Sequence, residues 1–424
     1  MIKKLSIILL ILILSTPCFA ATKQVMGTGT PDNFNGVSTE YYPMTSVGTS
    51  AWSTTEYTVV WPAAGTITDL CVELDSTTGA GNTSTWTVRL NKATPGTPTQ
   101  AIITNSTNDC DTTATTIAAG DEVSIQQVPT SAPSTSDPSW SIVWNPTTAD
   151  YTVIVGGTMA NTLATSGTEY LPMHGTRTPE SSAFEVSTLF PTGGTLRDMY
   201  IELGTDPGAG TTRIFTYGAL TCTVVGGEGT TCNSSALTQA VTANDVYTLT
   251  STVTGTPAAS IVSYGVVFVP TTSGQFTFHG STDDALSTND EFCFLSTAGT
   301  GTTPDGAGHW TGTTTTRECL SSIAFTMKNI YFESAVDIGL DTDLYNLYFR
   351  ADEANSALTC QLTGAGAGPW RCNASSDISV TAGQELSVAV TDDATTPSGG
   401  SSRWAFTGFI TPTGGAARRV ITVQ

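Results

Sequence analysis

The stretch Gly65–Leu74 reads GTITDLCVEL, and Gly194–Leu203 reads GTLRDMYIEL, 129 positions further along the chain. A third, weaker copy, FTMKNIYFE, covers Phe325–Glu333. In each copy apolar and polar residues alternate, which is the pattern of a β-strand with one buried face. The recurrence predicts a chain built from three copies of one β-unit.

Two further landmarks follow each copy in the same order. The first is a turn with Gly or Asn ahead of an alternating strand, and the second is a strand that carries an aromatic residue at a fixed place. Three landmarks in one order make the triplication a strong signal. The turn segments are AAGDEVSI, TANDVYTL and TAGQELSV, and the aromatic residues are Trp140, Tyr264 and Trp404.

Short alternating runs separated by Gly, Pro or Asn fill the first copy, and no segment has the apolar period of a long helix. We therefore expect an all-β protein of three tandem jelly-roll or β-sandwich domains of about 120–140 residues each. The expected boundaries are 37–158, 159–281 and 282–424, after a polar N-terminal arm over 21–36. The three copies could pack as a pseudo-threefold unit or follow one another as separate beads.

The chain opens MIKKLSIILLILILSTPCFA, with two lysines, an apolar core and a small-residue cleavage site. This predicts a secretory signal peptide over 1–20. The apolar run is short for a membrane span, so we expect no transmembrane anchor. The mature chain is expected to be secreted, either into the periplasm or out of the cell.

Nine cysteines are present, and the first of them, Cys18, leaves with the signal peptide. An even number of cysteines in an exported chain predicts a disulfide framework. Zinc is disfavoured because there is no CxxC pair and the chain holds only three histidines. The aligned hairpins, and elimination for the rest, predict the bonds Cys222–Cys232, Cys360–Cys372, Cys71–Cys110 and Cys293–Cys319.

The formal net charge of -21 argues against nucleic acid as a partner. Charged residues make up 12% of the chain, about half the usual fraction. The solvated surface must therefore consist largely of Thr, Ser, Asn and Gly, as in extracellular β-proteins.

Candidate chemistry is sparse. No GxSxG, HExxH or GxxxxGK[ST] motif is present, and His174, His279 and His309 are interpreted as ordinary loop or strand residues. We expect no enzymatic activity and no cofactor, although oxygen-rich loops would suit calcium. Glu73, Glu202 and Glu333 are interpreted as an outward strand face. The carboxylates weighed for calcium are Asp283, Asp284, Asp290, Glu291, Asp337, Asp341, Asp343, and the aligned Asp69 and Asp198 with Asn329; solvated loop acids are the preferred interpretation.

Exposed aromatic residues could form a platform for sugar stacking, although alternation places several tryptophans in the cores. Trp370, near the tip of the Cys360–Cys372 hairpin, is the best candidate for a ligand contact. Packing of Trp370 on its own hairpin is the preferred interpretation.

The second repeat resembles a jelly-roll-like domain of uncharacterised secreted bacterial proteins and of phage structural and tail-associated proteins. The features that carry the resemblance are the GTL strand, the PGAG turn, the LTC to TCN hairpin, the AND turn and the TGTPAA loop. The resemblance implies a structural or binding module. We therefore expect a non-enzymatic structural or adhesive protein that associates with itself or with a cell-surface partner; the alternative is a carbohydrate-binding protein with glycans as its partners.

Overall fold

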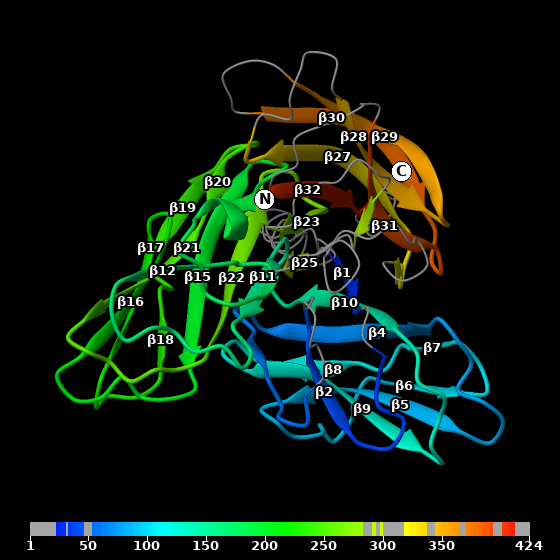
Figure 1. Cartoon of the computed structure of the whole chain (residues 1–424), viewed down its shortest axis with the longest axis horizontal. Helices are drawn as coiled ribbons and strands as arrows, with labels where there is room; N and C mark the ends of the chain where they lie inside the picture. Colours follow the sequence, from blue (N-terminus) through cyan, green and yellow to red (C-terminus); the bar gives the residue numbers. More distant parts are fainter. Residues whose placement is uncertain are drawn as a thin grey trace, which may run out of the picture.

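Three β-sandwiches make up the protein, and each forms one lobe in Figure 1. The computed structural model describes residues 23–30, 33–45, 53–282, 291–293, 297–299, 318–336, 344–364, 370–392 and 401–411. These residues contain one 3₁₀ turn, η1 (Phe184–Val186), and no α-helix. No helix in this part of the chain could cross a membrane. The predicted all-β sandwich class is confirmed.

Each sandwich has a first sheet, which contains its earliest strand, and a second sheet that covers it. In the first sandwich the first sheet has the order β1 (Gln24–Gly29), β10 (Pro138–Pro146), β4 (Gly65–Leu74) and β7 (Asn108–Asp111), with β8 (Thr115–Ile117) also on β4. The second sheet has the order β2 (Glu40–Pro43), β9 (Glu122–Thr130), β5 (Thr83–Leu90) and β6 (Gln100–Thr104), with β3 (Val59–Val60) on β9.

The second sandwich repeats this plan. Its first sheet runs β13 (Gly175–Thr176), β11 (Thr152–Gly157), β22 (Val262–Pro270), β15 (Gly194–Leu203) and β18 (Thr231–Asn233), with β19 (Thr238–Val241) on β15. Its second sheet runs β12 (Thr168–Leu171), β21 (Leu249–Thr254), β16 (Thr212–Tyr217) and β17 (Leu220–Val225), and β14 (Thr188–Leu189) pairs with β20 (Val246–Tyr247).

The third sandwich follows the same order. Its first sheet runs β25 (Thr297–Gly299), β23 (Gln275–Thr282), β32 (Ser402–Phe409), β27 (Phe325–Ser334) and β30 (Trp370–Val380). Its second sheet runs β24 (Glu291–Cys293), β31 (Glu385–Asp392), β28 (Leu344–Ala351) and β29 (Ala354–Thr363), with β26 (Cys319–Leu320) on β31.

Each sandwich begins one strand earlier than the sequence indicates. The segment expected as a polar arm contains β1, which pairs antiparallel with β10. Likewise β11 lies before the expected boundary at 158, yet it pairs with β22 of the second sandwich. Strand β23 lies almost wholly before the expected boundary at 281, yet it pairs with β32 of the third sandwich. The partners of these strands lie far away in the sequence, so local patterns give no sign of the pairing.

The apolar side chains of the three cores come from strands in which buried and less buried residues alternate. Along β15, for example, every second residue at each end is buried, and the apolar side chains point inward. The aligned aromatic residues Trp140, Tyr264 and Trp404 are all fully buried. Because five of the eight tryptophans lie in the cores, they stabilise the sandwiches and offer no platform to a ligand. These five are Trp61, Trp86, Trp140, Trp144 and Trp404.

The aligned position of Asp69, Asp198 and Asn329 marks a β-bulge. Asp69 and Asp198 have φ of 54° and 50°, in the left-handed region that Asp and Asn tolerate better than most residues. The register of β4, β15 and β27 against the central strand slips at this point. The shared residue type is thus explained by backbone geometry, without a calcium ion.

Three of the four predicted disulfides are confirmed: Cys71–Cys110, Cys222–Cys232 and Cys360–Cys372. The predicted Cys293–Cys319 bond is not made, and both cysteines lie buried in the third core. Their strands β24 and β26 follow each other along one edge of β31, where Cys293 lies opposite Val388 and Cys319 opposite Leu386.

The three sandwiches close into a ring through one repeated contact, in which a two-residue strand lies against the first sheet of another sandwich. We call these contacts seams. In the first seam β3 meets β11, β15 and β22; in the second β14 meets β23 and β32; in the third β26 meets β1, β4 and β10. The repeats therefore pack with pseudo-threefold symmetry and are not separate beads.

A small residue follows the buried aromatic residue in every repeat, because its side chain faces a seam. At the first seam, a Cβ added to Gly265 would lie 2.4 Å from the main-chain oxygen of Val60. At the third seam, Ser141 shares a hydrogen bond with Ser322. The corresponding residue of the second seam is Ala405. Larger side chains at this position would force the sandwiches apart.

Gly265→Ala should lower the free energy of unfolding by about 1–3 kcal/mol, because the added methyl group overpacks the first seam. Chemical denaturation followed by tryptophan fluorescence would measure the change. Gly96→Ala is the matched control, since an added Cβ there meets nothing within 4 Å. Equal stability of the two variants would contradict the seam.

Candidate functional site

The three aligned glutamates, Glu73, Glu202 and Glu333, each lie at a seam. They point away from the core of their own sandwich, as expected of an outward strand face, but the neighbouring sandwich covers them. Glu73 and Glu202 are half-buried, and Glu333 is 4% exposed. Burying a carboxylate costs free energy unless a partner compensates its charge, so the surroundings of these glutamates decide the chemistry of each seam.

The third seam holds a cavity of about 370 Å³ with an acidic lining. Glu73 reaches it from β4 of the first sandwich, and three glutamates reach it from the third sandwich. Carboxylate oxygens of Glu318, Glu353 and Glu385 lie within 4.8 Å of one another. Asp75 and Asp137 also line the cavity. This is the largest gathering of carboxylates among the described residues, and we take it as the candidate site.

Local structure fixes the three glutamates of the third sandwich. Glu318 precedes β26 and accepts a hydrogen bond from Ser387 Oγ. Glu353 lies in the tight turn between β28 and β29, where its φ is 61°. Glu385 begins β31, and its main-chain N–H donates to Asp352. The carboxyl groups therefore converge because three separate loops and strand ends meet at one seam.

Two carboxyl groups of the acidic lining have a raised pKa. Burial, and then the neighbouring Glu385 carboxyl, raises the pKa of Glu73 to about 7. Burial and the same neighbour raise the pKa of Glu318 to about 8. Both shifts have the sign expected when like charges crowd a site of low polarity.

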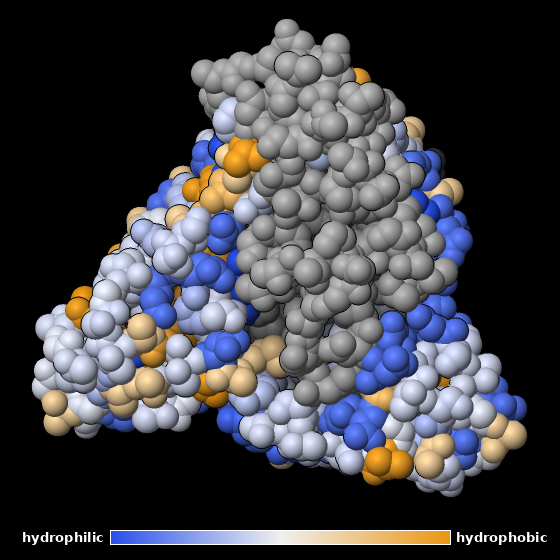
Figure 2. All heavy atoms as spheres, viewed as in Figure 1, coloured by the Kyte–Doolittle hydropathy of each residue, from blue (hydrophilic) through white to orange (hydrophobic). Residues whose placement is uncertain are grey.

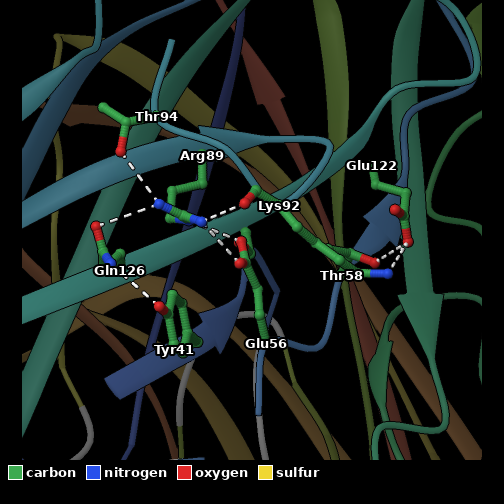
Figure 3. A network of polar contacts seen from close by, with 9 residues as sticks. Tyr41, Glu56, Thr58, Arg89, Lys92, Thr94, Glu122 and Gln126 are labelled. Carbon is green, nitrogen blue, oxygen red and sulfur yellow. Dashed lines mark hydrogen bonds and ion pairs between the residues drawn. The ribbon is translucent and has the colours of Figure 1, made fainter. Parts of the chain in front are cut away.

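The first seam has the same construction with different charges (Figure 3). Its turn residues Asn91 and Lys92, with φ of 50° and 60°, correspond to Asp352 and Glu353. The main-chain N–H of Asn91 donates to Glu122, as that of Asp352 donates to Glu385. The Lys92 ammonium lies 3.1 Å from the Glu122 carboxylate, and Thr58 donates to that carboxylate at 2.5 Å.

The repeat therefore aligns each member of the two clusters. Glu202, Glu122, Lys92 and Thr58 of the first seam correspond to Glu73, Glu385, Glu353 and Glu318 of the third seam, respectively.

The second seam compensates its glutamate with arginines. Arg403 Nη2 lies 2.7 Å from Glu333 Oε2, and Arg371 Nε lies 2.9 Å from the same oxygen. The Arg403 guanidinium also stacks 4.2 Å from the ring centre of Phe184, across the seam. The second seam thus pairs its aligned glutamate with two arginines. In the first seam Lys92 pairs with Glu122, and burial and then the Glu122 carboxylate raise the pKa of the aligned Glu202 although Lys92 opposes this shift. Carboxyl groups surround Glu73 in the third seam.

The acidic cavity could act chemically in two ways. Oxygen ligands at this separation suit a divalent cation such as calcium, and Glu318, Glu353 and Glu385 are the residues that could hold it. Alternatively Glu73 and Glu318, whose pKa values are raised, bind protons. The acidic loops proposed from the sequence for calcium, around 283–291 and 337–343, lie outside the described residues except for the backbone of Glu291.

Two histidines meet at the second seam, where sequence analysis expected ordinary residues. His174 contacts Ser281 Oγ at 3.1 Å and His279 contacts the Leu189 carbonyl at 2.9 Å, both across the seam. Burial lowers the pKa of His279 to about 4, and burial with the nearby His279 lowers the pKa of His174 well below its usual value. The neutral rings form hydrogen bonds between the second and third sandwiches. His309 lies outside the described residues.

Trp370 is half-buried and packs against the core of the third sandwich. This matches the preferred interpretation, in which it packs on its own domain, better than an exposed ligand contact. Trp52 and Trp310 lie outside the described residues. The remaining tryptophans are buried, so none of the described tryptophans is fully exposed for sugar stacking.

No known family model and no curated protein matches this sequence. The site is therefore interpreted by comparing the aligned residues of the three seams within the chain.

Acidification should weaken the second seam. Each histidine has a lowered pKa in the folded state, so the stabilisation from its neutral form is lost as the pH falls from about 6.5 towards 4. At most about 3 kcal/mol is involved for His279. The double variant His174→Gln/His279→Gln should lose less stability than wild type between pH 7 and 4.5 in urea denaturation. Parallel losses would contradict this role.

Proposed function

We propose that the chain is an exported, non-enzymatic structural or adhesive protein, in which three fused β-sandwiches act as one rigid unit. The observation that carries this proposal is the repeated seam that closes the three repeats into a ring. Structural proteins commonly bury surface through closed, symmetric interfaces between copies. In this protein one chain supplies all three copies, so the ring needs no assembly step.

The covalent framework and the surface support the proposal. Three disulfides suit an oxidising compartment outside the cytoplasm. The described surface in Figure 2 is mostly white to blue with scattered orange, consistent with a coat of Thr, Ser and Gly. The resemblance of the second repeat to jelly-roll domains of secreted and phage structural proteins points the same way. Self-association or a cell-surface partner would then use the outer faces of the ring.

Export and partner choice can be tested together. A tagged full chain, expressed in a bacterium, should lose residues 1–20 and appear outside the cytoplasm with its three disulfides oxidised. The same chain without residues 1–20 is the matched control and should stay inside. The purified mature chain should self-associate or bind cell surfaces while leaving a glycan array blank.

Two results would contradict the proposal. One is an uncleaved chain that remains in the cytoplasm with reduced cysteines. The other is selective glycan binding accompanied by a change in tryptophan fluorescence, which would establish a carbohydrate-binding protein instead.

A further inference from the structure

Strand β17 forms one edge of the second sheet of the second sandwich, on the outer side of that lobe (Figure 1). It pairs with β16 on one side only. The two strands are joined by the two-residue turn 218–219, so Tyr217 and Leu220 form the first hydrogen-bonded pair of the hairpin. Because hydrogen-bonded and non-hydrogen-bonded pairs alternate, the main-chain groups of Thr221 and Thr223 point out of the sheet edge.

The corresponding edge of the first sandwich, on β6, is closed by two aspartates. The main-chain N–H of Gln100 donates to Asp111 Oδ2 at 2.6 Å, and that of Ile102 donates to Asp109 Oδ2 at 2.6 Å. Both aspartates lie on β7, on either side of Cys110. An edge whose donors already have partners cannot accept a further strand.

The edge of β17 has no such caps. On β18, the two residues beside the aligned cysteine are Thr231 and Asn233 instead of aspartates. Thr221 and Thr223 occupy the same places on β17 as the capped residues on β6, and their main-chain N–H groups have no acceptor among the described residues. β17 therefore presents unpaired donors to solvent, which makes it open to pairing with another strand.

The aligned edge of the third sandwich belongs to β29. Residues 365–369, which follow this strand, lie outside the described part of the chain, whereas every residue from 212 to 254 is described. β17 is therefore the open edge whose surroundings are known.

The exposed side of β17 is free of charge, in a chain whose formal net charge is -21. The side chains that point outward are Thr221, Thr223 and Val225, and all three are exposed. The neighbouring outward side chains on β16 are uncharged as well: Thr212, Ile214 and Thr216. A high net charge opposes contact between two copies of a protein, but this repulsion is weakest where neither surface has a charged group.

We propose that two copies of the chain pair through β17, antiparallel and about a twofold axis beside Thr223. In this register Thr223 faces Thr223 of the second copy and Thr221 faces its Val225, so the outward main-chain groups of both edges meet in hydrogen-bonded pairs. Pairs of threonine and valine suit neighbouring strands. The two four-stranded sheets then form one continuous sheet across the dimer.

No like charges meet at the ends of this contact. Beyond Val225, the turn that contains Glu228 would lie near the turn 218–219 of the second copy, which consists of Gly218 and Ala219. The contact gives the self-association proposed above a specific surface, and it rests on that proposal. The first and third sandwiches stay free for a cell-surface partner.

Sedimentation velocity of the mature chain over a range of concentrations tests the contact. The wild type should shift from one chain to two as the concentration rises, because pairing of one edge buries a small area and is weak. Thr223→Lys should stay monomeric, since two lysines would face each other across the axis. The matched control Thr104→Lys makes the same charge change at an exposed threonine of the capped β6 and should dimerise as the wild type does.

A mixture of two variants tests the register. Thr223→Glu alone should also stay monomeric, because two carboxylates would then face each other. Equal amounts of the Thr223→Lys and Thr223→Glu variants should dimerise again, because opposite charges meet at the axis. Native circular dichroism of each variant checks that it is folded.

Three outcomes would overturn the proposal. The first is a wild-type chain that stays monomeric at every concentration, and the second is a Thr223→Lys variant that dimerises as readily as wild type. The third is a mixture of the two variants that stays monomeric. A monomeric wild type would remove this contact but not the exported structural role, which signal cleavage, disulfide oxidation and cell-surface binding test separately.

Discussion

The seam between sandwiches is the contact on which the rest of this structure depends. A two-residue strand, β3, β14 or β26, lies against the first sheet of another sandwich and extends its core. Val25 of the first sandwich belongs to the core of the third, and Val153, Val155 and Val267 of the second belong to the core of the first. Burial of this apolar surface at the first and third seams, together with the histidine hydrogen bonds of the second, makes one body from three domains.

A repeated seam also explains why each repeat keeps certain polar residues. The aligned glutamates Glu73, Glu202 and Glu333 are covered by a neighbour, so each needs compensation. In the first seam Lys92 pairs with Glu122, the neighbour of Glu202, and in the second Arg403 and Arg371 pair with Glu333 itself. The third seam places further carboxyl groups around Glu73. The three repeats thus form three interfaces that share one geometry but differ in the charged residues around the aligned glutamate.

Sequence reasoning captured the features that are local. Cys222–Cys232 and Cys360–Cys372 were predictable because each pair lies in one hairpin, and the aligned aromatic residues were predictable because alternation places them inward. The pairing of the first strands, β1, β11 and β23, could not be predicted, because their partner strands are distant in the sequence. The Cys293–Cys319 prediction, which rested on elimination alone, is wrong.

The acidic cavity was missed because its members come from four separate segments in two repeats. One signal was present: the aligned turns contain Lys92 in the first repeat and Glu353 in the third, while Glu122 and Glu385 stay the same. Recognising its meaning requires knowing that both turns face a neighbouring sandwich. Interfaces between domains leave little trace in the alternation of any single strand.

The most direct measurement of ring closure is a cross-link across the third seam, where Ser141 and Ser322 share a hydrogen bond although they are 181 positions apart. The variant Ser141→Cys/Ser322→Cys, oxidised at pH 6 and mapped by peptide mass spectrometry, should form an intramolecular disulfide from position 141 to position 322 or to the adjacent native Cys319. A variant that forms only intermolecular bonds, or none, while its three native disulfides remain intact would show that the first and third sandwiches do not meet.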